Sequence, residues 1–403
     1  MSQLHNRRTL LKVAAAATAA AALPNLSIGQ SKAEAHQRVV VLMIDGFDPR
    51  YIAASDMPVL AQWKRDGLYK QVKGVMPSVT NANNASICCG VWPETHGIIA
   101  NSYFDEKSGE ELYVESADLV LAPTLFERAA RQGVKSALLS SKAKTATLLM
   151  RGAEIVLTAE NPGPEWVKEL GAAPPIYSAD INYWLLNAAI HVLKTRPDIG
   201  VLYVHTTDFP MHMWPPEAPE SKEHLARLDE LFGQAMKAAP DAAFLATADH
   251  GMNAKGACWD LEQVCAKKGT PIRKAVSTGR DRYMKHHRGC SGAVYIHLKD
   301  PKDAPRVREI ISGVPGVERI LTKDEAAKEF HLMASRIGQL MVTGDKDTVF
   351  GELDDEKENF PGLRSHGSVH ETDIPLFVYN AKHAPAAEYF NHNLDLARWL
   401  YPI

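Results

Sequence analysis

Cysteine is scarce in this sequence and does not occur in the close pairs that bind zinc through sulfur. The chain of 403 residues contains five cysteines, and none of them forms a Cys-x-x-Cys pair. A thiolate zinc site is therefore not expected. Cys258 and Cys265 could pair in an oxidising compartment, whereas Cys88 and Cys89 lie in an apolar stretch and are interpreted as core residues.

An excess of one charge and a long apolar run are also missing. Lys and Arg together number 45 against 48 Asp and Glu, for a net charge of −3. This balance gives no reason to expect a nucleic-acid-binding surface. The apolar run at residues 13–23 is mostly alanine and falls well short of the ~20 residues that span a bilayer. No membrane span is expected in the mature protein.

The first 35 residues have the pattern of an export signal rather than of a fold. Arg7 and Arg8 precede the apolar run, and Ala33-Glu34-Ala35 has the small-x-small form of a cleavage site. The segment resembles a twin-arginine signal peptide. We expect the twin-arginine export machinery as a partner, cleavage near Ala35, and a periplasmic or secreted domain at residues 36–403.

Strands and helices alternate along most of the remaining chain. Residues 38–44, 200–204 and 242–246 are unbroken apolar runs, as expected of strands that are buried on both faces. Helical patterns separate them, at residues 58–67, 80–91, 125–131, 180–194 and 221–238. This alternation predicts an α/β fold with a mostly parallel central sheet covered by helices on both faces.

A change of pattern after Gly251 predicts a smaller inserted cap. Residues 254–290 are polar and rich in predicted loops, and a strand, helix, strand, helix succession follows at residues 291–298, 304–312, 316–321 and 323–330. We therefore expect an α+β cap at about residues 254–350. A strand at 374–379 and a helix at 394–401 return to the main domain.

Aspartate and histidine residues gather where the predicted strands end. Each has an ordinary explanation alone, as a turn or as part of a solvated helix. Carboxyl ends of parallel strands meet at one edge of a sheet, however, and that edge is where α/β proteins place their sites. Three carboxylates and three imidazoles are too many for one tetrahedral zinc but suit two. The six residues are Asp45, Asp208, His212, Asp249, His250 and His366.

Thr80 is the candidate nucleophile of such a two-metal site. It stands at the predicted start of the helix at residues 80–91, where the helix dipole and free N–H groups favour anions. A neighbouring zinc ion lowers the pKa of a hydroxyl, so no separate base is required. Thr80 could equally be the N-cap of the helix, and the two roles are compatible.

Taken together, these motifs resemble the alkaline phosphatase superfamily. The resemblance is nearest to its nucleotide pyrophosphatase/phosphodiesterase branch and, within that, to the phosphonoacetate hydrolases. It runs in order from about residue 38 to about residue 380. The motifs are Ile44-Asp45-Gly46, Met76-Pro77-Ser78-Val79-Thr80-Asn81-Ala82-Asn83-Asn84, Gly90-Val91-Trp92-Pro93-Glu94-Thr95-His96-Gly97, Thr206-Thr207-Asp208, Asp249-His250-Gly251 and Ser365-His366-Gly367.

The resemblance implies a division of these residues between two Zn²⁺ ions. It also implies that Asn83 donates a hydrogen bond to a phosphoryl oxygen, as in an oxyanion hole. The first zinc would be held by Asp208, His212 and His366. The second would be held by Asp45, Asp249, His250 and Thr80.

Two lysines suggest which substrate the site takes. Lys142 and Lys144 follow the predicted strand at residues 135–139 and match a Lys-x-Lys of the phosphonoacetate hydrolases. Their charge would bind the carboxylate of phosphonoacetate while the C–P bond breaks to give acetate and phosphate. Ordinary surface lysines would look the same in the sequence.

Two other functions stay open at this stage. The apolar residues Met211, Met213, Trp214 and Pro215 surround His212 and could line a pocket for a nucleobase, which would favour a phosphodiesterase or nucleotide pyrophosphatase. A periplasmic zinc-binding protein without catalysis is the non-enzyme alternative. His286 and His287 could approach the site from the cap, but a solvated basic loop is the preferred interpretation.

Overall fold

The buried strand β1 (Val39–Met43) lies in the middle of the sheet that positions the site. The computed structural model describes residues 36–402, so the predicted signal peptide at residues 1–35 lies outside the described residues. Every residue of β1 is buried, as its unbroken apolar sequence predicts. β1 pairs in parallel with β7 (Ile199–His205) on one side and with β8 (Ala243–Thr247) on the other.

The main sheet has seven strands in the order β2-β18-β8-β1-β7-β5-β6. Only β18 runs against its neighbours, pairing antiparallel with β2 and with β8. The predicted α/β fold with a mostly parallel sheet is confirmed. The outer strands are β2 (Leu68–Lys73), β18 (Asp373–Tyr379), β5 (Lys135–Ser140) and β6 (Ile155–Thr158).

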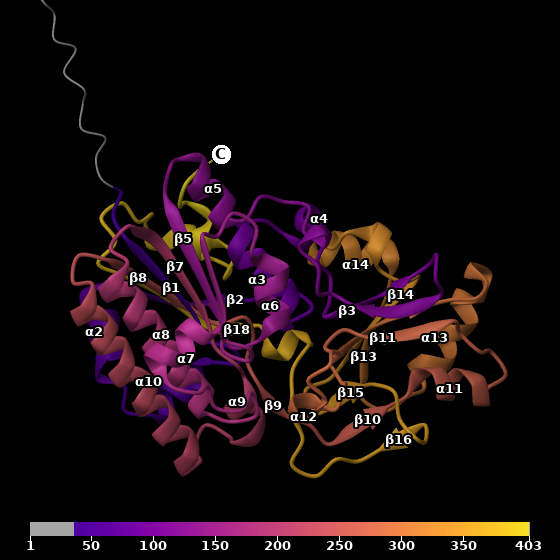
Figure 1. Ribbon diagram of the computed structural model, residues 1–403. Coiled ribbons are helices and arrows are strands. Elements are labelled where there is room, and N and C mark those ends of the chain that lie inside the picture. Colours follow the sequence, from indigo (N-terminus) through magenta and orange to yellow (C-terminus); the bar gives the residue numbers. More distant parts are fainter. Residues whose placement is uncertain (1–35, 403) are drawn as a thin grey trace, which may run out of the picture. The chain divides into compact units, whose positions relative to one another are not determined.

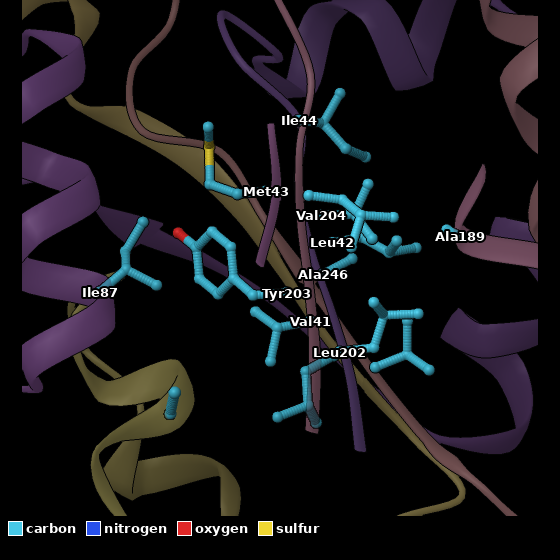
Figure 2. Close-up of a cluster of buried hydrophobic side chains, with 14 of the residues drawn as sticks. Val41, Leu42, Met43, Ile44, Ile87, Ala189, Leu202, Tyr203, Val204 and Ala246 are labelled. Atoms are coloured by element: carbon cyan, nitrogen blue, oxygen red, sulfur yellow. The ribbon is translucent and has the colours of Figure 1, made fainter. Parts of the chain in front are cut away.

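Helices cover both faces of this sheet (Figure 1). Residues of β1 and β7 alternate between the faces, so that Val41 and Tyr203 turn toward Ile87 whereas Leu42 lies on the side of Ala189 (Figure 2). The long helices α8 (Asp180–Thr195) and α10 (Pro219–Ala238) pack together on one face with α2 (Pro58–Asp66). The opposite face carries α3 (Thr80–Cys89), α6 (Ala143–Leu149) and the short closing helix α15 (Asp395–Arg398).

The remaining elements of the core are short and connect these layers. Among the described residues, no helix is both long and apolar enough to cross a bilayer. The closing helix is confined to α15, shorter than the predicted 394–401. The connecting elements are α1 (Pro49–Ala54), α4 (Pro93–His96), β3 (Ser102–Asp105), β4 (Glu110–Tyr113), α5 (Leu125–Arg131), α7 (Pro164–Leu170) and α9 (Phe209–Met213).

A second sheet lies within the range predicted for the cap. Its four strands are ordered β11-β12-β14-β13, and two of them, β11 (Lys274–Ser277) and β14 (Leu340–Gly344), were not predicted. Both are short, and β11 stands among polar loops, so neither gives a clear period in the sequence. The bounds of the cap as a domain stay a prediction. The other elements of this range are β10 (Ala257–Trp259), α11 (Leu261–Lys267), α12 (Met284–His287), β12 (Ala293–His297), α13 (Ala304–Ser312), β13 (Val317–Thr322), α14 (Lys323–Phe330) and β15 (Thr348–Phe350), and β16 (Lys357–Glu358) lies just beyond it.

The suggested pairing of Cys258 with Cys265 does not occur. Cys258 lies in β10 with its Sγ 3.0 Å from the Sγ of Cys290. Cys265 lies in α11 and packs in a different hydrophobic cluster, with Val264 and Ile272. The short separation of Cys258 and Cys265 in the sequence was misleading, because the strand and the helix direct their side chains into separate clusters.

Candidate metal centre

The predicted ligands meet at the carboxyl edge of the main sheet. Asp45 follows β1, Asp208 follows β7, and Asp249 and His250 follow β8. His366 comes from the segment after β17 (Arg364–Ser365), which pairs with β9 (Asn253–Ala254) just beyond His250. All of these side chains are buried. The convergence arises because β1, β7 and β8 are adjacent and parallel, so their ends share one edge.

Helix α9 brings Asp208 and His212 onto the same side of one turn. Asp208 is the N-cap of α9, and the backbone N–H of His212 donates to its carbonyl oxygen at 3.1 Å. The Nε2 of His212 lies 2.8 Å from Asp208 Oδ2. Its other ring nitrogen, Nδ1, lies 2.7 Å from the carbonyl oxygen of Arg364. An Asp-x-x-x-His spacing on a helix therefore brings two possible ligand atoms together.

The three histidines are oriented in the same way. In His366 the Nδ1 lies 2.8 Å from the carbonyl oxygen of Ser78, and in His250 it lies 3.0 Å from that of Gly251. A ring nitrogen that faces a carbonyl carries the proton, so Nε2 keeps its lone pair in His212, His250 and His366. Histidines that bind metal typically donate their second nitrogen to a carbonyl in this manner.

Two groups of ligand atoms have the spacing of metal sites. In each group the donor atoms lie within 4.8 Å of one another, and all the residues are buried. One group is Asp208, His212 and His366, which is the predicted first zinc site. The other group is Asp45, Asp208 and His250, so Asp208 borders both groups.

Within residues 36–402, several buried oxygen and nitrogen atoms at this edge have no hydrogen-bond partner. Asp45 Oδ1, Asp249 Oδ2 and His250 Nε2 are in this position. The Nε2 of His250 lies 3.4 Å from Asp45 Oδ1 and 3.5 Å from Asp249 Oδ2. Lone pairs that face each other at this distance repel unless a cation or a proton lies between them. The residues therefore fit a pair of metal ions, with ligand types that suit zinc.

The electrostatics of the cluster agree with a cation site. Burial and the charge of Asp45 raise the pKa of Asp249 well above its ordinary value. Burial also works against ionisation of Asp208, but Lys142 and His212 hold its pKa well below the usual range. Burial and the nearby ring of His250 hold the pKa of His366 well below its ordinary value. His366 therefore stays neutral, which is the form that binds metal.

Thr80 begins helix α3 and is buried, with 2% of its surface exposed. The N-cap is Val79, which makes no side-chain capping bond, so the hydroxyl of Thr80 is not occupied as a cap. Ser78, which precedes Val79, accepts hydrogen bonds from the segment of His366. Its carbonyl oxygen faces Nδ1 of His366, and its hydroxyl oxygen accepts from the N–H of Gly367. These bonds fix the start of α3 beside the predicted first zinc site.

The contacts of Asn83 do not fit the predicted oxyanion role. Its Oδ1 accepts from the N–H of Val75 and from Asn393. Its Nδ2 faces the carbonyl oxygens of Val75, Pro77 and Val79 at 3.1–3.3 Å. An amide with two hydrogens and two lone pairs has nothing left to offer a ligand. Asn83 instead holds the loop that leads into Thr80.

Asn101 is a better placed amide that sequence reasoning missed. Its Oδ1 accepts the N–H of Asn81 in the first turn of α3, and its Nδ2 donates to the carbonyl oxygen of Gly279. Among the hydrogen bonds of the described residues, the second hydrogen of this amide has no partner, and the side chain is bonded to Asn81, the residue after Thr80. The one signal for Asn101 in the sequence was its position shortly after the Gly90–Gly97 motif.

The two predicted substrate lysines differ in their contacts. Lys142 Nζ lies 2.8 Å from Asp45 Oδ2 and 2.7 Å from Asp208 Oδ1, so it reaches the ligand cluster itself. These carboxylates raise the pKa of Lys142 well above its ordinary value against the effect of burial. Lys144 is paired with Asp281 of the cap range. The structure thus places Lys142 in contact with two of the predicted ligands. Lys144 contacts Asp281, which is not a predicted ligand.

The cap range contributes two histidines for which the sequence favoured a solvated loop. His286 and His287 are buried rather than solvated. His286 Nδ1 lies 3.5 Å from Asp208 Oδ1, and His287 Nε2 lies 3.1 Å from Asp281 Oδ1. His205, the last residue of β7, was also missed, and its Nε2 lies 3.3 Å from Asp45 Oδ2. Its place at a strand end was a usable signal. For the histidines of α12 the sequence offered only their position in the predicted cap.

Curated relatives resemble part of this chain. A venom phosphodiesterase of Naja atra is 25% identical over 238 residues, which is 54% of this chain and 26% of that protein. Ectonucleotide pyrophosphatase/phosphodiesterase family member 1 of Homo sapiens is 25% identical over 242 residues, 54% of this chain and 24% of that protein. The chain thus spans about a quarter of the length of these relatives.

Solved structures resemble nearly all of it. Phosphonoacetate hydrolase of Sinorhizobium meliloti 1021, in complex with phosphonoformate, has a TM-score of 0.81 and 25% identity, covering 91% of this chain and 95% of that chain. Murine ectonucleotide pyrophosphatase/phosphodiesterase 5 has a TM-score of 0.66 at 16% identity, covering 89% of this chain and 93% of that chain. The second likeness concerns the fold alone.

Family profiles match both parts of the sequence. The twin-arginine signal profile matches residues 5–24, which confirms an export signal and implies a periplasmic or secreted protein. The profile of type I phosphodiesterase / nucleotide pyrophosphatase matches residues 39–369, most of the chain. The chain belongs to the type I phosphodiesterase/nucleotide pyrophosphatase family of the alkaline phosphatase superfamily.

Proposed function

We propose that this protein is a two-zinc hydrolase that cleaves the C–P bond of a small carboxylated phosphonate, with phosphonoacetate as the substrate. The observation that carries this proposal is a buried ammonium group, Lys142 Nζ, in direct contact with the ligand cluster. The likeness to phosphonoacetate hydrolase over 91% of the chain supports it. Family membership supports the broader class, a hydrolase that acts on phosphorus.

For the metal ligands we propose the division that the resemblance implies. One Zn²⁺ would be held by Asp208, His212 and His366. The other would be held by Thr80 together with the two aspartates and the histidine at the ends of β1 and β8, which are Asp45, Asp249 and His250. Two zinc ions in such a site supply Lewis acidity to a phosphoryl group and lower the pKa of a bound hydroxyl.

Thr80 is the group that attacks phosphorus in this proposal. A bond forms from its Oγ1 to phosphorus while the C–P bond breaks, and the electron pair of that bond leaves with the carbon. The carboxylate group on that carbon delocalises the pair. The proton that Thr80 gives up on forming the new bond is balanced by the proton that the carbon takes up, which yields acetate. Water then displaces phosphate from Thr80, which regains its proton. The N-terminus of α3 favours the anion throughout, and Asn101 offers its free amide hydrogen to a phosphoryl oxygen.

Lys142 has the position required to bind the carboxylate of the substrate. It is the cation nearest to the ligand atoms, and only 3% of its side chain is exposed, so its charge acts in a medium of low dielectric. The partners of Lys142 are Asp45 and Asp208, two of the proposed metal ligands, whereas the partner of Lys144 is Asp281, which is not one of them. We infer that Lys142 makes the direct contact and that Lys144 positions the segment that carries Asp281 and His287.

The enclosure of the site favours a small substrate. The predicted ligands are at most 4% exposed, and His286 covers Asp208 from the cap range. The apolar residues around His212 do not form one lining, because Met211 is buried in the main core while Met213 is 50% exposed. A nucleobase pocket at this position is therefore not supported.

The second candidate is a phosphodiesterase or nucleotide pyrophosphatase, which the family profile favours. A zinc-binding protein without catalysis is less well supported, because the ligands, the helix start at Thr80 and a buried cation all occur together. Measuring the zinc-loaded protein on two substrates separates these functions. One substrate is phosphonoacetate and the other is bis(p-nitrophenyl) phosphate.

We expect phosphate release from phosphonoacetate to be much faster than cleavage of the diester. Thr80→Ala protein, loaded with zinc in the same way, is the control for contaminating activity. Diester cleavage alone would move the protein to the phosphodiesterases. No turnover of either substrate by protein that holds zinc would support the non-catalytic alternative.

A further inference from the structure

Cys258 and Cys290 form a thiol pair that the proposed reaction does not use. Their sulfur atoms are 3.0 Å apart, and the residues are 32 positions apart in the sequence. Both side chains are buried, in a cluster with Val349. The other cysteines lie elsewhere, with Cys88 and Cys89 in α3 and Cys265 in α11.

The pair connects two parts of the cap range. Cys258 is the middle residue of β10, which pairs with β15 and β16. Cys290 follows α12, the helix that carries His286 and His287, and its N–H donates to the carbonyl oxygen of His287 at 3.0 Å. A bond between the sulfurs would therefore anchor the segment that lies against the metal ligands.

Cys290 also contacts the loop that carries a metal ligand. The hydroxyl of Ser365 donates to the carbonyl oxygen of Cys290 at 2.9 Å, directly before His366. The hydroxyl of the next residue, Ser291, donates to the carbonyl oxygen of His366 at 3.2 Å. Fixing Cys290 thus limits movement of His287 on one side and of His366 on the other.

The export signal takes this pair out of the reducing cytosol. Disulfides form and persist in exported proteins, whereas cytosolic thiols are kept reduced. Two thiols that are already in contact need little backbone movement to become bonded. The match to a twin-arginine signal at residues 5–24 therefore gives the pair a compartment in which it can be oxidised.

We propose that Cys258 and Cys290 are a redox modification site that becomes a disulfide after export. The oxidant is a protein or small molecule that carries a disulfide. One cysteine attacks it as a thiolate to form a mixed disulfide, and the other cysteine then displaces the oxidant as a dithiol. Two electrons and two protons pass to the oxidant, and the Cys258–Cys290 bond forms. Because both sulfurs are buried, exchange proceeds during local opening of the segment around α12.

Thiol counting on the full exported chain tests the proposal without any variant. Protein taken from the periplasm is denatured and alkylated with iodoacetamide, before and after reduction with dithiothreitol, and its mass is measured. We expect three of the five cysteines to be alkylated without reduction and all five after it. Peptide mapping of the unreduced sample should give one linked pair, Cys258 with Cys290. Five alkylated cysteines without reduction, or a link that involves Cys265, would overturn the proposal.

A matched set of variants tests what the bond does. Reduction should lower the melting temperature of the wild-type protein by several degrees, because the cross-link restricts the unfolded chain. Cys265→Ser should keep this response, whereas Cys258→Ser should lose it. An equal response to reduction in both variants would contradict the assignment, and the peptide map of the wild type decides the matter if either variant fails to fold.

Discussion

The edge of the main sheet and the segment around α12 supply the same site in different ways. Asp45, Asp208 and Asp249 stand at the ends of buried, mutually paired strands, and their places are set by the sheet. His286 and His287 come from the short helix α12, with Asp281 just before it. Their places are set by ion pairs and ring contacts with the core. In the proposed reaction the first region provides metal ligands, and the second lies over them, with His286 beside Asp208.

We therefore expect substitutions at the sheet edge to abolish function, and substitutions that face the cap range to change substrate binding or stability.

The largest effect is expected at Thr80. Thr80→Ala should lower phosphate release by at least about 10³-fold, since it removes the attacking oxygen itself. Thr80→Ser should retain a part of the rate. Both variants should melt within a few degrees of the wild type in thermal denaturation, and substantial turnover by Thr80→Ala would refute the assignment of the nucleophile.

The second largest effect is expected on zinc content, which should depend on the edge of the main sheet and not on the segment around α12. Asp208 belongs to both ligand groups, so Asp208→Asn should reduce bound zinc strongly and stop turnover. Asp281→Asn is the matched control, because it alters a buried carboxylate that contacts Lys144 and His287 instead. Zinc per chain, measured by atomic emission after dialysis, should fall in the first variant only. A similar loss in both would mean that the cap range takes part in holding the metals.

The two asparagines provide a comparison within the core. Asn101→Ala should lower kcat by about 10²–10³-fold, the usual cost of removing one oxyanion donor. Asn83→Ala should instead lower the melting temperature, because the amide of Asn83 holds three backbone carbonyls of the loop before Thr80. Steady-state kinetics and calorimetry on both variants test this. A large kcat effect at Asn83 with unchanged melting would restore the oxyanion role that the resemblance implied.

The smallest of these effects is expected at the two lysines. Lys142→Ala should raise KM for phosphonoacetate by about ten- to a hundred-fold, which corresponds to the ~1.5–3 kcal/mol of a hydrogen bond to a charged group. It should affect p-nitrophenyl phosphate, which lacks the carboxylate, much less. Lys144→Ala should act mainly on stability, since it leaves the buried Asp281 without its ammonium partner. Equal KM effects on both substrates for Lys142→Ala would mean that it binds the phosphoryl group.

The sequence predicted the sheet edge because its signals are local. An apolar run followed by Asp45, or by Asp249 and His250, carries the strand and the ligand in one stretch, and the parallel fold then brings the stretches together. The contacts of Asn83 and Asn101 depend on how a loop closes, and both residues look alike in the sequence. The burial of His286 and the pairing of Lys144 with Asp281 depend on packing between distant segments. The Cys258–Cys290 contact also depends on such packing. No local sequence pattern indicates contacts of this kind.

The proposed reaction requires a two-metal centre at the carboxyl edge of the main sheet. Metal-free protein, prepared with a chelator, should be titrated with Zn²⁺ while phosphate release from phosphonoacetate is followed. We predict no release without metal and a rise that levels off at two equivalents of zinc per chain. Release by the metal-free protein, or full activity at one equivalent, would contradict the two-zinc account.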